Sequence, residues 1–195
     1  SNALSRSVAF TDECRMLMEF QPMPKIDSFA VESLERLSPT LFVAIERTEL
    51  PGLEDGPSSA ELAELLANHR ELDWSMVDAA SVDLALSGLW LLAGDLDRSH
   101  SISQGIGSSE GSFWHGIMHR REGDFGNSKY WFRRVGSHPV LDQLPDLTDG
   151  DYSDPFDFVD QCSSAVRKGG EAYQRCQRAQ WIEWQALMVH CLRGE

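Results

Sequence analysis

The apolar positions of the chain recur at helical spacing, whereas hydrophobic alternation of period two is scarce. Leu62, Leu65 and Leu66 fall on one helical face, and residues 82–93 are almost continuously apolar, as in a buried helix. Gly94 directly follows this apolar stretch, in the position where glycine commonly ends a helix. The pattern therefore predicts an all-α fold and gives no confident strand.

Capping and breaking residues mark the ends of the predicted helices. Ser38 followed by Pro39 begins one helix, and Ser58 with Glu61 forms a capping box for another. Residues 51–57 carry two prolines and two glycines and are typical of a linker. Further helices are expected at 28–37, 82–93, 98–106, 113–122, 127–135, 155–168 and 171–192, with a flexible loop at 108–111 and an acidic loop at 143–154.

A short internal repeat lies in the middle of the chain. GDLDRS at 94–99 matches GDFGNS at 123–128, and the spacing is 29 residues. Glycine can end one helix and aspartate can cap the next, so each copy predicts a helical hairpin. The fold expected is a set of antiparallel hairpins, as a bundle or a short tetratricopeptide-like stack. The residues that suggest the tetratricopeptide likeness are Gly116, Gly123, Phe125, Ser128 and Phe132.

Length and composition favour one domain. Hydrophobic residues make up 42% of the chain and charged residues 25%, as in a folded globular protein. Residues 1–3 resemble a cloning scar, and 4–195 are expected to form a single helical domain. Its parts would be N-terminal helices and linker at 4–57, central hairpins at 58–139, and an acidic loop with C-terminal helices at 140–195.

The cysteine and hydropathy patterns indicate the cellular compartment of the protein. None of the four cysteines belongs to a Cys-x-x-Cys pair, so neither a zinc knuckle nor a dithiol motif is indicated. No apolar run reaches the roughly 20 residues that cross a bilayer, and the start has no signal-peptide pattern. The expectation is a cytoplasmic protein with reduced thiols and no membrane partner.

Charge is unevenly distributed along the chain. The formal net charge is −14, which disfavours binding of long nucleic acids. Residues 115–138 nevertheless contain five basic and two acidic side chains, so this segment is a basic island. The island lies within FWHGIMHRREGDFGNSKYWFRRVGSHP at 113–139.

This segment resembles an uncharacterised protein family of bacteria and fungi. Members of that family carry a WHxIxHRRExDxxNxKYWFRRVGxHP block, and the match covers roughly residues 89–139. No activity is established for the family, so the resemblance implies kinship and no mechanism.

Histidines in the segment suggest a metal site. His115 and His119 are four residues apart and Glu122 follows three later, so all three share a helical face. Two imidazoles and a carboxylate suit a divalent ion such as zinc, manganese or iron. His100 or His138 would complete the ligand set from a neighbouring helix.

The same histidines also have a structural interpretation. His115 and His119 can pack between hairpins, hydrogen-bonded to carboxylates and backbone. Gly116 stands where a zinc peptidase of the His-Glu-x-x-His type has its glutamate, so that chemistry is not predicted. His69 and His190 have no predicted role.

The basic residues suggest an anion site. Guanidinium groups suit carboxylates and phosphates, and the interleaved aromatic residues could stack on a base or a sugar. The alternative is that these cations pair with nearby acids and that residues 130–132 belong mostly to the core. The candidate anion-binding residues are His100, Arg120, Arg121, Lys129, Arg133, Arg134 and His138.

Three functional hypotheses remain open from the sequence. The first is a binding or scaffold protein for a small anionic molecule or an acidic peptide. The second is a metal-dependent enzyme, with a hydrolase as one form, and the third is a purely structural accessory domain. The expected site is a cleft around His100, His115, His119, Arg120 and Arg134.

Overall fold

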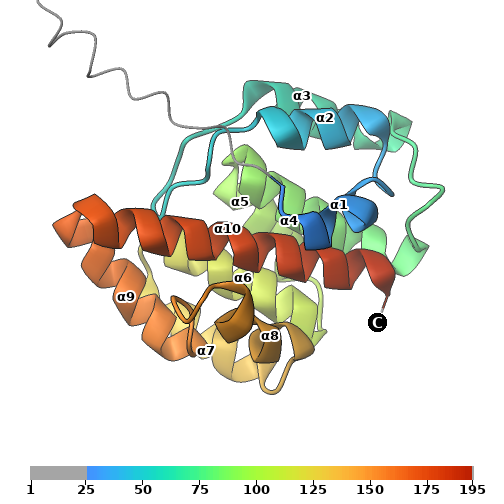
Figure 1. Ribbon diagram of the computed structural model, residues 1–195. Coiled ribbons are helices and arrows are strands. Elements are labelled where there is room, and N and C mark those ends of the chain that lie inside the picture. The colour runs from blue at the N-terminus through green and yellow to red at the C-terminus, as the bar shows by residue number, and fades with distance from the viewer. Residues whose placement is uncertain (1–25, 195) are drawn as a thin grey trace, which may run out of the picture.

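The computed structural model describes residues 26–194, and this part of the chain is all helical, as predicted (Figure 1). No helix within it is both long and apolar enough to span a membrane. Two short 3-10 helices occur at His69–Glu71 and Ala79–Ser81. The α-helices are α1 (Ser28–Leu34), α2 (Pro39–Arg47), α3 (Ala60–Ala67), α4 (Val82–Ala93), α5 (Leu96–Ser103), α6 (Ser109–Glu122), α7 (Phe125–Val135), α8 (Pro139–Leu147), α9 (Pro155–Lys168) and α10 (Gly170–Arg193).

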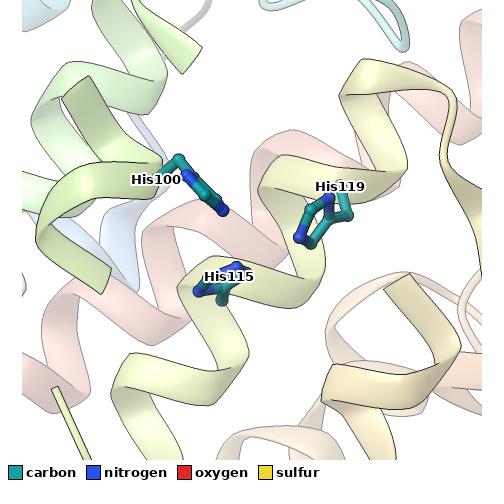
Figure 2. A group of neighbouring side chains, drawn as sticks. All are labelled: His100, His115 and His119. Atoms are coloured by element: carbon teal, nitrogen blue, oxygen red, sulfur yellow. The ribbon is translucent and has the colours of Figure 1, made fainter. Parts of the chain in front are cut away.

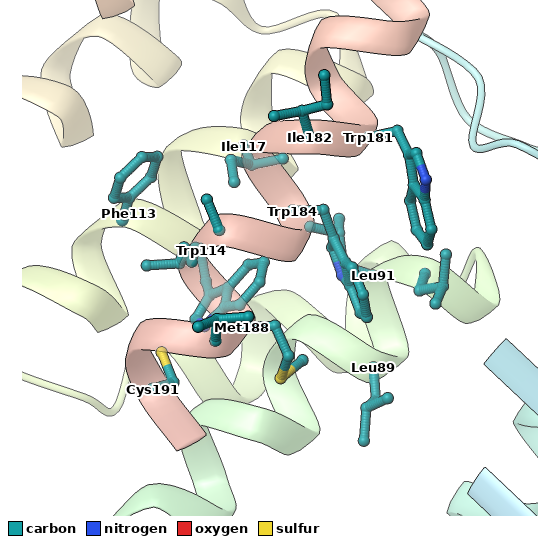
Figure 3. Packing of buried hydrophobic residues seen from close by; sticks show 14 of the residues in the cluster. Leu89, Leu91, Phe113, Trp114, Ile117, Trp181, Ile182, Trp184, Met188 and Cys191 are labelled. Carbon is teal, nitrogen blue, oxygen red and sulfur yellow. The ribbon is translucent and has the colours of Figure 1, made fainter. Parts of the chain in front are cut away.

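The long helix α10 organises the core. It crosses the molecule and packs against α1, α4, α8 and α9 (Figure 1). Trp181 and Trp184 stack along it with ring centroids 5.2 Å apart, and Trp114 of α6 packs against Trp184 (Figure 3). A Cβ at Gly88 of α4 would lie 2.6 Å from the Trp114 ring, so glycine permits this close packing.

The two predicted hairpins are present as α4–α5 and α6–α7, and α5 packs against α6. Gly94 (φ +83°) and Gly123 (φ +86°) end the first helix of each pair in the left-handed conformation. Asp95 and Asp124 then cap the second helix by accepting the backbone N–H three residues on. The closer likeness to a tetratricopeptide pair stays a prediction.

Buried serines hold the two helices of each hairpin together. Ser87 Oγ donates to the carbonyl of Ser99 at 3.2 Å, and Ser128 Oγ donates to the carbonyl of Gly116 at 2.8 Å. Each bond joins two positions that are twelve residues apart. Ser87 and Gly116 are 29 residues apart, and so are Ser99 and Ser128. A Cβ at Gly116 would lie 3.0 Å from the Phe132 ring, so α6 and α7 are in close contact here. The repeat is therefore also a repeat of packing contacts.

Some predicted helix starts were wrong because the wrong cap was chosen. Ser59, not Ser58, caps α3 by accepting the N–H of Leu62 at 3.3 Å. Ser108 accepts the N–H of Gly111 at 3.3 Å, so residues 109–111 form the first turn of α6 instead of a loop. The start of α5 likewise lies two residues earlier than predicted.

The acidic loop predicted at 143–154 was also partly wrong, because α8 runs to Leu147 with Pro145 inside it. Val140 and Leu144 are buried one turn apart, and this burial favours the helix despite the proline. The predictions for residues 1–25 lie outside the described part of the chain.

Candidate functional site

Three histidines converge between α5 and α6 (Figure 2). The ring centroids of His100 and His115 are 4.6 Å apart, those of His115 and His119 4.8 Å, and those of His100 and His119 5.4 Å. One nitrogen from each ring lies within 4.8 Å of one nitrogen of both others. Two imidazole nitrogens that share a tetrahedral ion are about 3.3 Å apart, so small ring rotations would bring these into coordinating range.

His115 is the most enclosed member of the cluster. It is 2% exposed and its ring stacks on Trp131, with centroids 3.8 Å apart and 20° between the planes. Burial, with the neighbouring His119 and His100, lowers the pKa of His115 to about 3. The ring is therefore neutral near pH 7, as a metal ligand must be.

The hydrogen bonds of His115 and His119 indicate which nitrogen of each ring would bind an ion. Ser103 Oγ lies 3.3 Å from the carbonyl oxygen of His100 and 3.3 Å from Nδ1 of His115; when the hydroxyl donates to the carbonyl, it accepts from Nδ1. Nδ1 of His119 lies 2.9 Å from Oε2 of Glu122, an acceptor when ionised. In the tautomers with these bonds, both rings carry a proton on Nδ1 and have the lone pair on Nε2.

Glu122 lies behind His119 and not among the converging nitrogens, although the sequence grouped it with them. Its carboxylate orients the ring, as carboxylates commonly do for metal-binding histidines. Asn127 lies on the other side and its Nδ2 is 3.1 Å from Nε2 of His119. An ion bound through that nitrogen would displace the amide.

Arg120, which the sequence placed in the cleft, is fully buried in the core. Its guanidinium donates to both carboxylate oxygens of Glu183 and to Oε1 of Gln180. It also lies 4.7 Å from the centre of the Phe158 ring. At Arg120 these contacts therefore favour the alternative in which the cation pairs with an acid of the protein itself.

Arg121 is also buried, and it connects the loop at residues 51–57 to helix α4 through hydrogen bonds. Its guanidinium donates to the carbonyls of Glu54, Gly56 and Leu91, which joins residues 51–57 to the end of α4. Burial lowers the pKa of Arg121 to about 10, so it stays charged at neutral pH.

The remaining basic residues lie on α7, toward solvent. Lys129 pairs with Asp160 at 2.7 Å. Arg133 and Arg134 are exposed and lie over the rings of Phe156 and Trp131, at 5.8 and 5.1 Å. The anion-binding interpretation therefore depends on these two exposed guanidinium groups. The aromatic run 130–132 is only partly core, with Phe132 buried, Trp131 half-buried and Tyr130 48% exposed.

A second cluster joins His138 to two residues that the sequence did not single out. Oε1 of Glu110 is 3.5 Å from Nε2 of His138 and 3.4 Å from Nε2 of His190. The two histidine rings are 4.7 Å apart. The contact between α6 and the end of α10 brings together positions 80 residues apart, and no local spacing could have indicated it.

An open cavity of about 450 Å³ lies beside Glu122, and none of the three histidines is among its lining residues. Glu122, the partner of His119, forms part of its wall. Asp97, one turn before His100 on α5, forms another part. Asp55 and Asp95 add two further carboxylates, so the cavity has a negative potential.

The chain matches no protein-family model, no curated protein and no solved structure. The resemblance of residues 89–139 to an uncharacterised family stays a prediction.

Proposed function

We propose that the protein is a divalent-metal-dependent hydrolase in which His100, His115 and His119 hold the ion. The single observation that carries this is the convergence of three imidazoles, and in two of them Nδ1 contacts Ser103 or Glu122, which would leave Nε2 for an ion. Three-histidine sites leave a coordination position open for water, and a bound divalent ion makes that water a nucleophile near neutral pH.

The carboxylates of the cavity beside Glu122 support a substrate class. Asp55, Asp95 and Asp97 would attract a cationic or neutral polar molecule and repel a phosphate ester. The scissile group in this proposal is an ester or an amide, bound with its polar or cationic portion toward these acids.

The chain's own residues have defined tasks in this proposal. Trp131 excludes water from one face of His115, and Glu122 keeps the proton of His119 on Nδ1. The low pKa of His115 keeps that ring free of a competing proton.

Metal analysis combined with hydrolysis assays tests the proposal. Protein purified without a metal-affinity step is stripped with chelator, reloaded with Zn²⁺ or Mn²⁺ and assayed on a cationic and an anionic chromogenic ester. We expect metal-dependent hydrolysis of the cationic ester, with loss of both activity and one bound ion in His115→Ala. Hydrolysis that is equal in the stripped protein, or absent at full metal loading, contradicts the proposal. His69→Ala is the matched control, since His69 lies outside both histidine clusters.

A further inference from the structure

We propose that Glu110, His138 and His190 form a second divalent-metal site, independent of the three-histidine cluster. The three residues come from three helix ends. Glu110 lies in the first turn of α6, His138 caps the start of α8, and His190 lies in the last turn of α10. An ion here would join the ends of helices that are distant in the sequence.

The distances in this cluster fit a shared ion better than direct hydrogen bonds. Charge-assisted bonds between nitrogen and a carboxylate are about 2.7–2.9 Å long. Glu110 Oε1 is instead 3.5 Å from Nε2 of His138 and 3.4 Å from Nε2 of His190. Two ligands about 2.0–2.2 Å from one tetrahedral ion are separated by about 3.3–3.6 Å, which matches both distances.

The buried nitrogen of His138 gives an independent indication. His138 is 2% exposed, and its Nε2 has no partner in good hydrogen-bond geometry among the described residues; its acidic neighbour is Oε1 of Glu110, at 3.5 Å. Buried polar atoms nearly always have a well-formed partner, and an ion between this nitrogen and the carboxylate would explain the long contact. The side chains of Glu110 and His190 are 19% and 10% exposed, so an ion could enter from their side.

The charge of the cluster suits a divalent cation. Ser109 Oγ donates to Oε1 of Glu110 at 3.1 Å, and such a bond favours the ionised carboxylate. Glu110 therefore supplies one negative charge at neutral pH. Two imidazoles and one carboxylate form a ligand set used for zinc and for iron, with positions left open.

Binding would require one rearrangement at His138. Its Nδ1 accepts the backbone N–H of Val140 at 3.2 Å, so a neutral ring carries its proton on Nε2. Coordination through Nε2 moves that proton to Nδ1 and replaces the capping bond of α8 with the metal bond. No net proton is gained or lost in this exchange, since the ring is neutral before and after.

The number of bound ions in paired variants tests this site. The stripped full chain is dialysed against Zn²⁺, and zinc per chain is measured by elemental analysis. We expect about two ions in the wild type and in His69→Ala, about one in His190→Ala, and none in the double variant His115→Ala/His190→Ala. Glu110→Gln keeps the size of the side chain and should cause the same loss of bound zinc. It therefore provides the test if His190→Ala folds poorly.

The outcomes for the two clusters are distinguishable. Two ions retained by both His190→Ala and Glu110→Gln overturn the second site. So does one ion in the wild type that His115→Ala removes. One ion that His190→Ala removes and His115→Ala keeps supports the second site while it contradicts the proposed three-histidine centre.

Discussion

The imidazole of His115 stacks on the indole of Trp131, with ring centroids 3.8 Å apart and planes inclined by 20°. One ring comes from α6 and the other from α7, so the contact joins the two helices of the second hairpin. The indole shields one face of a buried imidazole from water, which contributes to the burial that lowers its pKa. Packing of α7 against α6 therefore affects the pKa of His115, a candidate metal ligand.

Replacement of Trp131 by alanine is expected to raise the pKa of His115 from about 3 toward its usual 6.5, because water then reaches the ring. We also expect a loss of roughly 2–3 kcal/mol in the free energy of unfolding, less than for a fully buried tryptophan. NMR titration of the imidazole resonances measures the first effect and urea unfolding the second. Tyr130→Ala, at an exposed neighbouring position, should leave the His115 pKa unchanged, and an unchanged pKa in Trp131→Ala contradicts the argument.

Stability is expected to fall as the pH drops below 6.5. The unfolded chain protonates His115 near pH 6.5 whereas the folded chain resists protonation down to about pH 3, so the unfolded state binds more protons across this window. One such group changes the free energy of unfolding by at most about 1.4 kcal/mol per pH unit. His138, whose pKa is also lowered by burial and by His190, acts in the same direction.

Urea unfolding at several pH values between 4.5 and 6.5 checks this dependence. Below about pH 4.5 the Glu110 carboxylate, with a folded pKa of about 2, adds a further loss in the same direction. The variant His115→Asn should have a flatter pH profile than the wild type, whatever its absolute stability. Equal slopes in the two proteins would show that His115 is not the group responsible.

The buried pair of Arg120 and Glu183 is expected to be structural. Removal of either partner leaves an unpaired buried charge, so Arg120→Met or Glu183→Leu alone should cost about 3–5 kcal/mol in unfolding free energy. The double variant should cost far less than the sum, because both charges are then gone. Lys129→Met, which breaks the more exposed pair with Asp160, should cost no more than about 1 kcal/mol. Additive effects in the Arg120–Glu183 cycle would contradict this role.

Local patterns were sufficient to predict the all-α class, the two hairpins and the extents of α4 and α9. Gly94 and Gly123 with their following aspartates determine the hairpin turns through backbone conformation and capping, which are short-range effects. Pro145 misled the prediction for α8, because burial of Val140 and Leu144 outweighs one lost backbone hydrogen bond.

The candidate sites were harder to predict. They depend on the direction in which each side chain points and on contacts between residues that are distant in the sequence. Helical spacing correctly placed His115 and His119 on one face, but it could not show that Arg120, the next residue, points into the core toward Glu183. The contact of Glu110 with His190 depends on the tertiary packing of α10, which sequence spacing does not encode. Identification of a function from such a sequence therefore requires the fold first.

The two partners of His119 should affect metal affinity in opposite directions. Glu122 keeps the ring in the tautomer that can bind, so Glu122→Gln should weaken Zn²⁺ binding at the three-histidine cluster by about 10–100-fold. Asn127 donates to the nitrogen that an ion would use, so Asn127→Ala should leave the affinity unchanged or increase it. Competition titrations with a chromogenic chelator, in a His190→Ala background that isolates this cluster, measure both affinities. Asp160→Asn is the matched surface control, and equal weakening by Glu122→Gln and Asn127→Ala would show that these partners act only by supporting the fold.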